Sequence, residues 1–326
     1  MRQFFKTLSL LSAALLLSAC SGIEPEEREY ALGMLIGGEN VSIAAAELSG
    51  EAEGRPSCTF LEGSGKTLAQ AVSKISADTG GALYTGQLML CVIEKDTLDK
   101  KSLSELISLF CTDDDLSRGA AVAVTDDIEV LKTADKEGKD ITRYMREYCK
   151  SSTKTGKGLT LDCDSLIHTL ISTDGDALIP YLECKNGELR INGATALNNW
   201  QYAETVDMQA AEAALWLIHG RKNSIVINSG GNIIEFDKVS VSKKISDGIE
   251  YKIKTRARLL QSGSELDTEK AEKELAAKIL SAAQRLYAQG CDYSEAAEFY
   301  RLKTQRKAEA KDISHKITLK TTWKGM

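Results

Sequence analysis

The sequence predicts an α+β protein of several domains, with an N-terminal mixed α/β region followed by a C-terminal antiparallel β-meander packed by a long helix. Three observations predict this fold class. Short apolar runs alternate with helical spacings up to residue 172. Three β-rich runs separated by glycine turns then occupy residues 224–260. A single apolar stripe finally recurs at helical spacing across residues 267–289.

The N-terminal region is predicted to open with a β-hairpin. Residues 30–36 and 41–48 are apolar runs, and the turn sequence Gly37-Gly38-Glu39-Asn40 separates them. Farther on, Thr67 precedes apolar residues at helical spacing and can cap that helix. The remaining elements alternate in type, with strands at 87–93 and 120–124 and helices at 102–110, 127–133, 140–149 and 164–172. We expect the polar stretch 151–158 to be a surface loop.

A second hairpin is predicted near the middle of the chain. Asn186-Gly187 lies between the apolar runs 177–184 and 188–197, and Asn-Gly in this context is the strongest short hairpin signal. We place a domain boundary at this turn. The boundary gives an N-terminal α+β region at 30–187, with two subdomains as the alternative to one, and a C-terminal domain at 188–326.

The C-terminal domain is predicted to be a sheet that one helix covers. Its meander strands are expected at 224–228, 233–244 and 249–260. The helix at 267–289 has apolar residues on one side only, which are Leu275, Ile279, Ala282 or Ala283, and Leu286. Such a one-sided helix must lie on another element, and the meander is the nearest sheet without a cover.

Two further elements are predicted after this helix. Asp292, with Glu295 three positions later, resembles a capping box for a second helix. The end of the chain alternates between apolar and polar residues, as in a half-buried strand that returns to the sheet. The residues on the inner side of that strand are Ile317, Leu319, Thr321 and Trp323.

The N-terminus has the layout of a secretory signal. Arg2 and Lys6 form a short basic region, an apolar run follows, and Leu17-Ser18-Ala19-Cys20 fits the bacterial lipobox. Processing would remove residues 1–19 and leave a diacylglyceryl group on the thiol of Cys20. The apolar run is far shorter than the ~20 residues that a bilayer requires, and an ordinary cleaved signal needs no cysteine at this position.

Lipidated Cys20 is expected to hold the mature chain on a membrane, because a diacylglyceryl group supplies the two acyl chains that stable anchoring requires. Residues 20–29 would form a polar spacer. The folded part is then expected on the extracytoplasmic face.

Charge and composition describe a globular chain. Of its 326 residues, 43% are hydrophobic and 27% charged, and the net charge of −6 gives no general basic field for nucleic acid. The last stretch is nevertheless rich in basic residues, namely Arg301, Lys303, Arg306, Lys307, Lys311, Lys316, Lys320 and Lys324. We expect a solvated helix face and strand edge here, with a patch for anionic lipid or an acidic partner as the alternative.

The cysteines and tryptophans are predicted to be structural. Seven cysteines follow Cys20, so they cannot all pair within one chain, and none has a short metal-binding spacing. We expect most of them to be reduced, with a disulfide between Cys149 and Cys163 as the alternative. Trp200 and Trp216 are predicted to anchor the core.

No motif for catalysis, cofactor binding or metal binding is complete. Residues 62–67 resemble the end of a phosphate-binding loop, but the motif requires glycine where Phe60 stands. The acidic run 113–115 lacks the later ligands and the glycine of a calcium loop. The histidines are far apart and have no catalytic or metal spacing; they are His168, His219 and His315. We therefore predict no catalytic residue, cofactor or metal.

Several segments, in this order, resemble the Ger(x)C family, the lipoprotein C subunits of bacterial spore germinant receptors. They are the lipobox cysteine, EREYALGMLIG, LEGSGKTLAQAVSKI, GQLMLCVIEKDTL, LISLFCTDDDLSRGAAVAV, INGATALNNWQYAETVDMQAAEAALWL, AAQRLYAQGCDYSEAAEFY and ITLKTTWKGM. Family members often carry Trp-Asp after the lipidated cysteine, an aspartate after the first strand and an arginine before the acidic turn. This chain instead has Ser21-Gly22, Gly37-Gly38 and Cys111-Thr112, which makes it a divergent member.

The resemblance implies a non-enzymatic α+β subunit on the outer face of the spore inner membrane. It implies partnership with a transporter-like B subunit and a membrane-associated A subunit, in germination that small nutrients trigger. The alternative is a solute-binding lipoprotein of an uptake system. Such a protein should alternate strands and helices through two lobes, whereas residues 224–262 here form a continuous meander.

Overall fold

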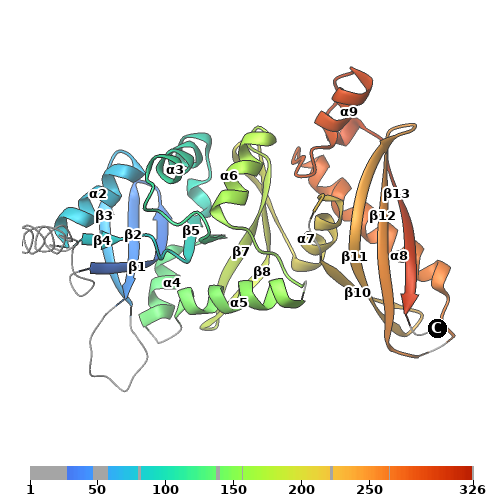
Figure 1. The fold of residues 1–326 in the computed structure, drawn as a ribbon, viewed down its shortest axis with the longest axis horizontal. Coiled ribbons are helices and arrows are strands. Elements are labelled where there is room, and N and C mark those ends of the chain that lie inside the picture. The colour runs from blue at the N-terminus through green and yellow to red at the C-terminus, as the bar shows by residue number, and fades with distance from the viewer. Residues whose placement is uncertain are drawn as a thin grey trace, which may run out of the picture.

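The computed structural model describes residues 28–46, 58–79, 82–136, 140–155, 157–220, 223–263 and 265–324. Two β-sheets lie one after the other along the long axis of the molecule, and helices pack on both (Figure 1). The fold is α+β, as predicted. The signal segment 1–19, Cys20 and most of the spacer 20–29 lie outside the described residues. No helix in the described part of the chain is long and apolar enough to cross a membrane.

The first sheet is parallel in its middle and antiparallel at its edges. Its order is β3-β2-β1-β5-β6-β7-β8-β9, with β4 paired to β1. The strands are β1 (Arg28–Gly37), β2 (Asn40–Ala46), β3 (Cys58–Ser64), β4 (Ala82–Tyr84), β5 (Leu90–Glu94), β6 (Ala121–Thr125), β7 (Ala177–Lys185), β8 (Glu188–Asn198) and β9 (Gln201–Val206). Strands β1, β5, β6 and β7 run parallel, and the predicted hairpin β1–β2 is present. Helices cover both faces, which explains why the central strands are almost wholly apolar.

Helices lie above and below this sheet in Figure 1. One face is covered by α2 (Leu68–Asp78), α3 (Lys100–Thr112) and α6 (Cys163–Ser172), and the other by α4 (Ile128–Lys136) and α5 (Ile141–Thr155); the short helix η2 (Lys95–Thr97) follows β5. The capping role of Thr67 is confirmed, because its Oγ1 accepts a hydrogen bond from the backbone N of Gln70 at 3.2 Å.

The predicted loop at 151–158 is wrong for most of its length. Helix α5 continues to Thr155, because Ser152 still faces the interior of the protein. The Tyr148 hydroxyl, one turn earlier, accepts a hydrogen bond from the backbone N of Leu159 at 3.0 Å. The helix thus holds the segment that follows it, and most of this polar sequence is helical.

The second predicted hairpin joins β7 to β8. Asn186 and Gly187 have positive φ angles of 52° and 72°, as a tight two-residue turn requires. Both strands belong to the first sheet, which continues to β9. The turn chosen as the boundary between 30–187 and 188–326 therefore lies inside a sheet, and the change to the second sheet falls between residues 206 and 224. The division into domains stays a prediction.

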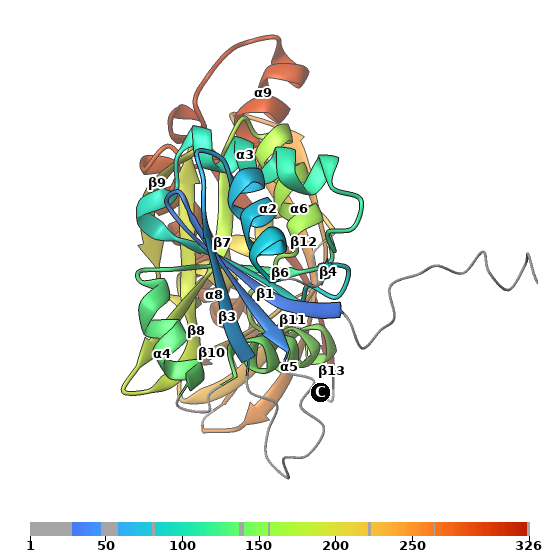
Figure 2. The same ribbon diagram turned by 90° about the vertical axis from the view of Figure 1, so that its left-hand side faces the viewer.

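The second sheet contains the predicted meander and the predicted terminal strand. Strands β10 (Ser224–Ser229), β11 (Asn232–Ile245) and β12 (Ile249–Gln261) are antiparallel, and β13 (His315–Lys324) adds parallel to β12. Helix α8 (Thr268–Ala288) packs on one face, and its predicted stripe is buried. In Figure 2, strands β11, β12 and β13 lie to the right of α8, so the helix covers the face opposite to the one seen in Figure 1.

A single hydrophobic core joins the two sheets. Leu178 and Val206 of the first sheet belong to the same buried cluster as Tyr251 of the second, and Trp216 is fully buried between them. Trp200 is also buried, at 7% exposure, so both tryptophans anchor the interior as predicted. The connecting elements are α7 (Met208–Ala214), η3 (Leu215–Leu217), α9 (Ala296–Thr304) and η4 (Ala310–Asp312).

Candidate functional site

Two aspartates meet where the C-terminal helices contact the first sheet. Asp176 directly precedes β7, and Asp292 follows the end of α8, after Gly290 has turned the chain with a φ of 83°. Oδ2 of Asp176 accepts a hydrogen bond from the backbone N of Asp292 at 2.6 Å, and Oδ1 accepts one from the backbone N of Asn199 at 2.8 Å. A single carboxylate therefore holds together the start of β7, the β8–β9 turn and the α8–α9 connection. We name this place the junction.

The Asp292 side chain anchors α9, though not by the predicted capping box. Its Oδ1 and Oδ2 accept hydrogen bonds from the backbone N of Ala296 and Ala297, both at 2.7 Å. Glu295 is itself the residue before the helix, with a left-handed φ of 56°, and its side chain caps nothing. The capping-box prediction was wrong because residues 292–295 form a turn before the helix, so Asp292 reaches the first helical amides from one turn away.

Burial changes the acidity of both aspartates. It raises the pKa of Asp292 to about 6, although hydrogen bonds from Ala297 and Ala296 and the charge of Lys243 act in the opposite direction. Burial likewise raises the pKa of Asp176, against the hydrogen bonds that this carboxylate accepts. The junction therefore contains a carboxyl group that titrates well above the ordinary range for aspartate.

A buried aromatic cluster lies beneath the junction. The Tyr287 hydroxyl is 2.6 Å from Oγ of Ser294 and 3.1 Å from the hydroxyl of Tyr251. The ring of His315 stacks on Tyr287, with centroids 4.6 Å apart. Lys243 donates a hydrogen bond to the carbonyl of Ser294. The hydroxyls of Tyr251, Tyr287 and Ser294 thus bind one another inside the core, whereas Nδ1 of His315 is buried without a hydrogen-bond partner among the described residues.

A cavity of about 950 Å³ opens beside the junction. Both parts of the chain line it, with Asp174 and Asp176 on one side and Asp292, Arg301 and Lys311 on the other. Trp200 fixes Asp174, because its Nε1 donates to Oδ1 of that residue at 3.3 Å. A cavity with both signs of charge can hold a small polar molecule. Ser172 and Glu295 also line it, and Oγ of Ser172 donates a hydrogen bond to Oε1 of Glu295 at 3.2 Å.

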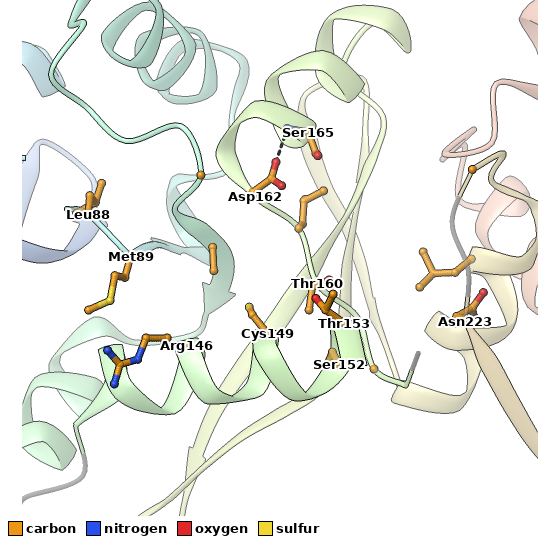
Figure 3. A pocket seen from close by; sticks show the side chains of 16 residues that line it. Leu88, Met89, Arg146, Cys149, Ser152, Thr153, Thr160, Asp162, Ser165 and Asn223 are labelled. Atoms are coloured by element: carbon orange, nitrogen blue, oxygen red, sulfur yellow. Dashed lines mark hydrogen bonds between the residues drawn. The ribbon is translucent and has the colours of Figure 1, made fainter. Parts of the chain in front are cut away.

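A second cavity, of about 850 Å³, lies between the first sheet, α5 and the start of the second sheet (Figure 3). Helix α5 contributes Arg146, Cys149, Ser152 and Thr153 to its wall. The dashed line in Figure 3 marks Oδ1 of Asp162 accepting from the backbone N of Ser165 at 2.7 Å, which caps α6. Burial raises the pKa of the Cys149 thiol, so this cysteine is a poor nucleophile.

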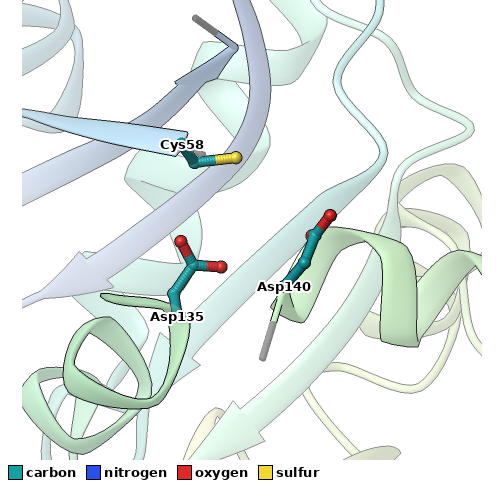
Figure 4. Close-up of side chains that lie close together, drawn as sticks. All are labelled: Cys58, Asp135 and Asp140. Carbon is teal, nitrogen blue, oxygen red and sulfur yellow. The ribbon is translucent and has the colours of Figure 1, made fainter. Parts of the chain in front are cut away.

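The structure also brings together Cys58, Asp135 and Asp140 (Figure 4). Their ligand atoms lie within 4.8 Å of one another, and a thiolate with two carboxylates is a donor set that zinc accepts. Each carboxylate already has a structural task, because Asp135 accepts from the backbone N of Ile141 and Asp140 from that of Arg143. Sequence reasoning missed this group because Cys58 is remote from the aspartates in the chain. The absence of a metal stays a prediction.

The other candidate residues lie apart. His168 is exposed on α6, His219 lies 3.3 Å from the carbonyl of Val241, and His315 lies 2.7 Å from that of Ala310. The acidic run is a turn after α3, in which Asp113 accepts from the backbone N of Asp115 at 3.0 Å. No disulfide joins the cysteines that the structure describes, so Cys149 and Cys163 are not linked. Cys20, the one predicted site residue, lies outside the described part.

The comparisons with known proteins identify the family. The family model described as the spore germination protein N-terminal domain matches residues 21–184, half of the chain, so the chain belongs to this spore germination family. It is a member of the Ger(x)C family, as its sequence motifs predict.

A solved structure, the crystal structure of the GerBC protein, has a similar fold. Its TM-score is 0.50 at 10% sequence identity, and the alignment covers 87% of this chain and 93% of that one. This likeness shows a shared fold across both sheets. No curated protein matches the chain.

Proposed function

We propose that this chain is a lipid-anchored, non-enzymatic subunit of a spore germinant receptor. The observation that carries the proposal is the family match, which begins at residue 21, directly after Cys20 of the lipobox. The family domain thus starts where the mature lipoprotein is predicted to start. Lipidated Cys20 would hold the subunit on the outer face of the spore inner membrane.

The polar side chains at the junction support a role in assembly rather than in catalysis. Asp176 and Asp292 bind backbone amides, and the hydroxyls of Tyr251, Tyr287 and Ser294 beneath them bind one another. We therefore assign the chain to signalling or assembly with the A and B subunits of the receptor, in germination that a small nutrient triggers.

The shape of the C-terminal part disfavours the alternative of a solute-binding lipoprotein. A second lobe of such a protein would contain strands alternating with helices. Here β10, β11 and β12 follow one another with no helix between them, and α8 packs on only one face.

The test uses spores whose only copy of the chain carries Cys20→Ala. We expect these spores to lose nutrient-triggered germination, measured as the fall in optical density after nutrient addition, and the protein to leave the detergent phase in a partitioning assay. Cys111→Ala, at an exposed cysteine of α3, is the matched control and should behave as the natural sequence. Normal germination of the Cys20→Ala spores, with unchanged partitioning of the protein, would contradict the proposal that the chain is a lipid-anchored receptor subunit.

A second measurement addresses the partners. Purification of the tagged chain from spore membranes should recover the A and B subunits together with it. Recovery of a permease or an ATPase of an uptake system in their place would favour the solute-binding alternative.

A further inference from the structure

The second sheet has one face that α8 covers and one face that lysines occupy. Along β12, Tyr251, Ile253 and Thr255 are buried toward α8, whereas Lys252 and Lys254 between them are exposed. Strand β13 alternates in the same way, and its exposed positions include Lys316, Lys320 and Lys324. We call these five lysines, Lys252, Lys254, Lys316, Lys320 and Lys324, the lysine face.

The strand register concentrates these charges. Lys254 is the direct partner of Lys320 across β12 and β13, and Lys324 is the partner of Arg258, whereas Lys316 lies opposite Glu250. Neighbouring strands are about 4.8 Å apart, and like charges directly opposite each other are unfavourable. The long side chains of lysine and arginine can move apart in water, but the repulsion between these cross-strand pairs still destabilises the folded chain. Binding to an anionic surface would relieve that repulsion.

Acidic residues neutralise the lysine face only in part, because Glu250 lies opposite Lys316 in the strand register and the charge of Lys252 helps to lower the pKa of Glu250. The carboxylates on this side of the sheet are occupied by other cations, because Glu250 pairs with Lys244, Asp237 with Arg256, and Glu235 with Arg258 and Lys157. None of the five lysines lies within ion-pair distance of a carboxylate in the part of the chain that the structure describes. The positive charge is local, since the whole chain carries −6.

Protection of a sheet edge explains only part of this pattern. Lysines on an edge strand hinder pairing with another chain, and β13 is an edge strand. Lys252 and Lys254, however, lie on β12, which has β11 on one side and β13 on the other. Edge protection gives no reason for lysines on that inner strand.

The shape of the lysine face selects the kind of anion. Its charges stand in rows on an open sheet, and none of the five lysines lines either of the two cavities described above. Such rows fit a planar array of anionic groups better than a single small ligand. A membrane leaflet with anionic headgroups presents such an array and attracts basic residues close to its surface.

The path of the chain places a membrane on this side. In Figure 2, β12 and β13 lie to the right of α8, and the blue strand β1 enters the first sheet from the right as well. Seven residues lie between Cys20 and Arg28 at the start of β1, which makes eight residue-to-residue steps. An extended chain covers about 3.5 Å per step, or roughly 28 Å in total. A lipid on Cys20 and the lysine face can therefore contact one membrane.

We propose that the lysine face docks on anionic phospholipid headgroups of the membrane that carries the lipid anchor, so that the body of the protein lies along the membrane. The proposal rests on the proposed function, since it needs the anchored form. Its occupant is the lipid surface, and an acidic segment of a partner protein is the competing outcome.

The test uses the mature chain, residues 20–326 with Cys20→Ala and without the signal segment 1–19, so that neither the lipid nor the apolar signal run can hold it. Sedimentation with vesicles of phosphatidylcholine alone is compared with vesicles that also contain phosphatidylglycerol. We expect binding only to the anionic vesicles, and loss of that binding at high salt. Adding Lys254→Glu with Lys320→Glu should weaken binding about tenfold or more.

The matched control is Lys270→Glu with Lys273→Glu, which makes the same charge change on α8, across the sheet from the lysine face. This control should bind as strongly as the parent. Its Lys273→Glu change removes an exposed ion pair with Glu269, which contributes less than about 1 kcal/mol, so all variants should remain folded at the assay temperature. Equal binding to both kinds of vesicle, or an equal loss in both double variants, would overturn the proposal. A third result would also overturn the proposal. In it, the parent chain does not bind anionic vesicles, and the Lys254→Glu/Lys320→Glu chain no longer purifies with the A or B subunit, so that the partner of the lysine face is a protein. The germination test of Cys20→Ala is independent of each of these results.

Discussion

Asp176 accepts a hydrogen bond from the backbone of Asp292, although 116 residues separate them in the chain. This bond fixes the turn between α8 and α9 against the start of β7. Asp176 is buried, with only 8% of the residue's surface exposed. Because Asp176 is buried, water cannot easily replace this hydrogen bond between two segments that lie far apart in the sequence.

The first prediction concerns this contact. Asp176→Ala leaves the backbone N of Asp292 and that of Asn199 without their acceptor, and each unsatisfied buried donor costs about 1 to 3 kcal/mol. We expect the free energy of unfolding in urea to fall by about 2 to 4 kcal/mol. Asp114→Ala, at an exposed aspartate with no hydrogen bond from its described side chain, should change it by less than about 0.5 kcal/mol. Equal effects of the two changes would contradict this account of the junction.

The second prediction concerns pH. Burial raises the pKa of Asp292 to about 6 in the folded chain, whereas an unfolded aspartate titrates near pH ~3.9. Between these values the folded state binds more protons than the unfolded state, so the contribution of Asp292 is present below pH ~4 and is lost as the pH rises through about 6.

The measurement is the difference in unfolding free energy between the natural chain and Asp292→Asn at several pH values. Asparagine has no proton to lose in this range, so the difference should shift against the natural chain by about 2 to 3 kcal/mol between pH ~4 and pH ~7. A difference that is independent of pH would show that Asp292 titrates at its ordinary pKa.

The third prediction concerns the terminal strand. The ring of Trp323 meets Phe236 edge-to-face, with centroids 5.6 Å apart, and its Nε1 donates to Glu272 of α8 at 3.3 Å. Trp323→Ala should lower the unfolding free energy by about 2 kcal/mol, because it removes a large apolar side chain from the face that α8 covers. The neighbouring Thr322 points outward, so Thr322→Ala is the control. Deletion of residues 313–326 should cost more than Trp323→Ala; an unchanged melting temperature would make the tail an appendage.

The fourth prediction concerns Gly193 in β8, part of the segment INGATALNN. Its φ is 142°, and a Cβ there would lie 2.0 Å from the carbonyl oxygen of Val206 on the paired strand β9. A backbone atom cannot move aside as a side chain can, so Gly193→Ala should destabilise the chain by more than about 2 kcal/mol. Gly119→Ala, where the nearest atom lies 3.9 Å away, should be nearly neutral. Equal stability of the two variants in urea would refute this explanation.

The elements that were predicted correctly are those whose signals are local. Asn186-Gly187 specifies its hairpin, Thr67 caps its helix, and the stripe from Leu275 to Leu286 specifies the buried side of α8. In each case neighbouring residues carry the whole signal. The errors have local causes too, since the polar residues after Cys149 resemble a loop while Ser152 and Tyr148 keep α5 helical.

The arrangement of the sheets and the junction could not be predicted in this way. Strand β3 pairs with β2, yet its residues 58–64 carry no clear alternation and escaped notice. Asp176 and Asp292 belong to no motif, because their contact depends on how β7 and α8 pack. Burial, which sets the pKa of Asp292, is likewise a property of the folded chain alone.

The shared core of the two sheets determines how the molecule can move. Bending between the sheets would pull Trp216 and its neighbours, among them Leu178 and Tyr251, out of one buried cluster. The ion pair between Arg285 of α8 and Glu204 of β9, at 2.8 Å, opposes the same bend. We therefore expect the two sheets to move as one rigid body, so that a tilt imposed at one end of the molecule displaces the other end.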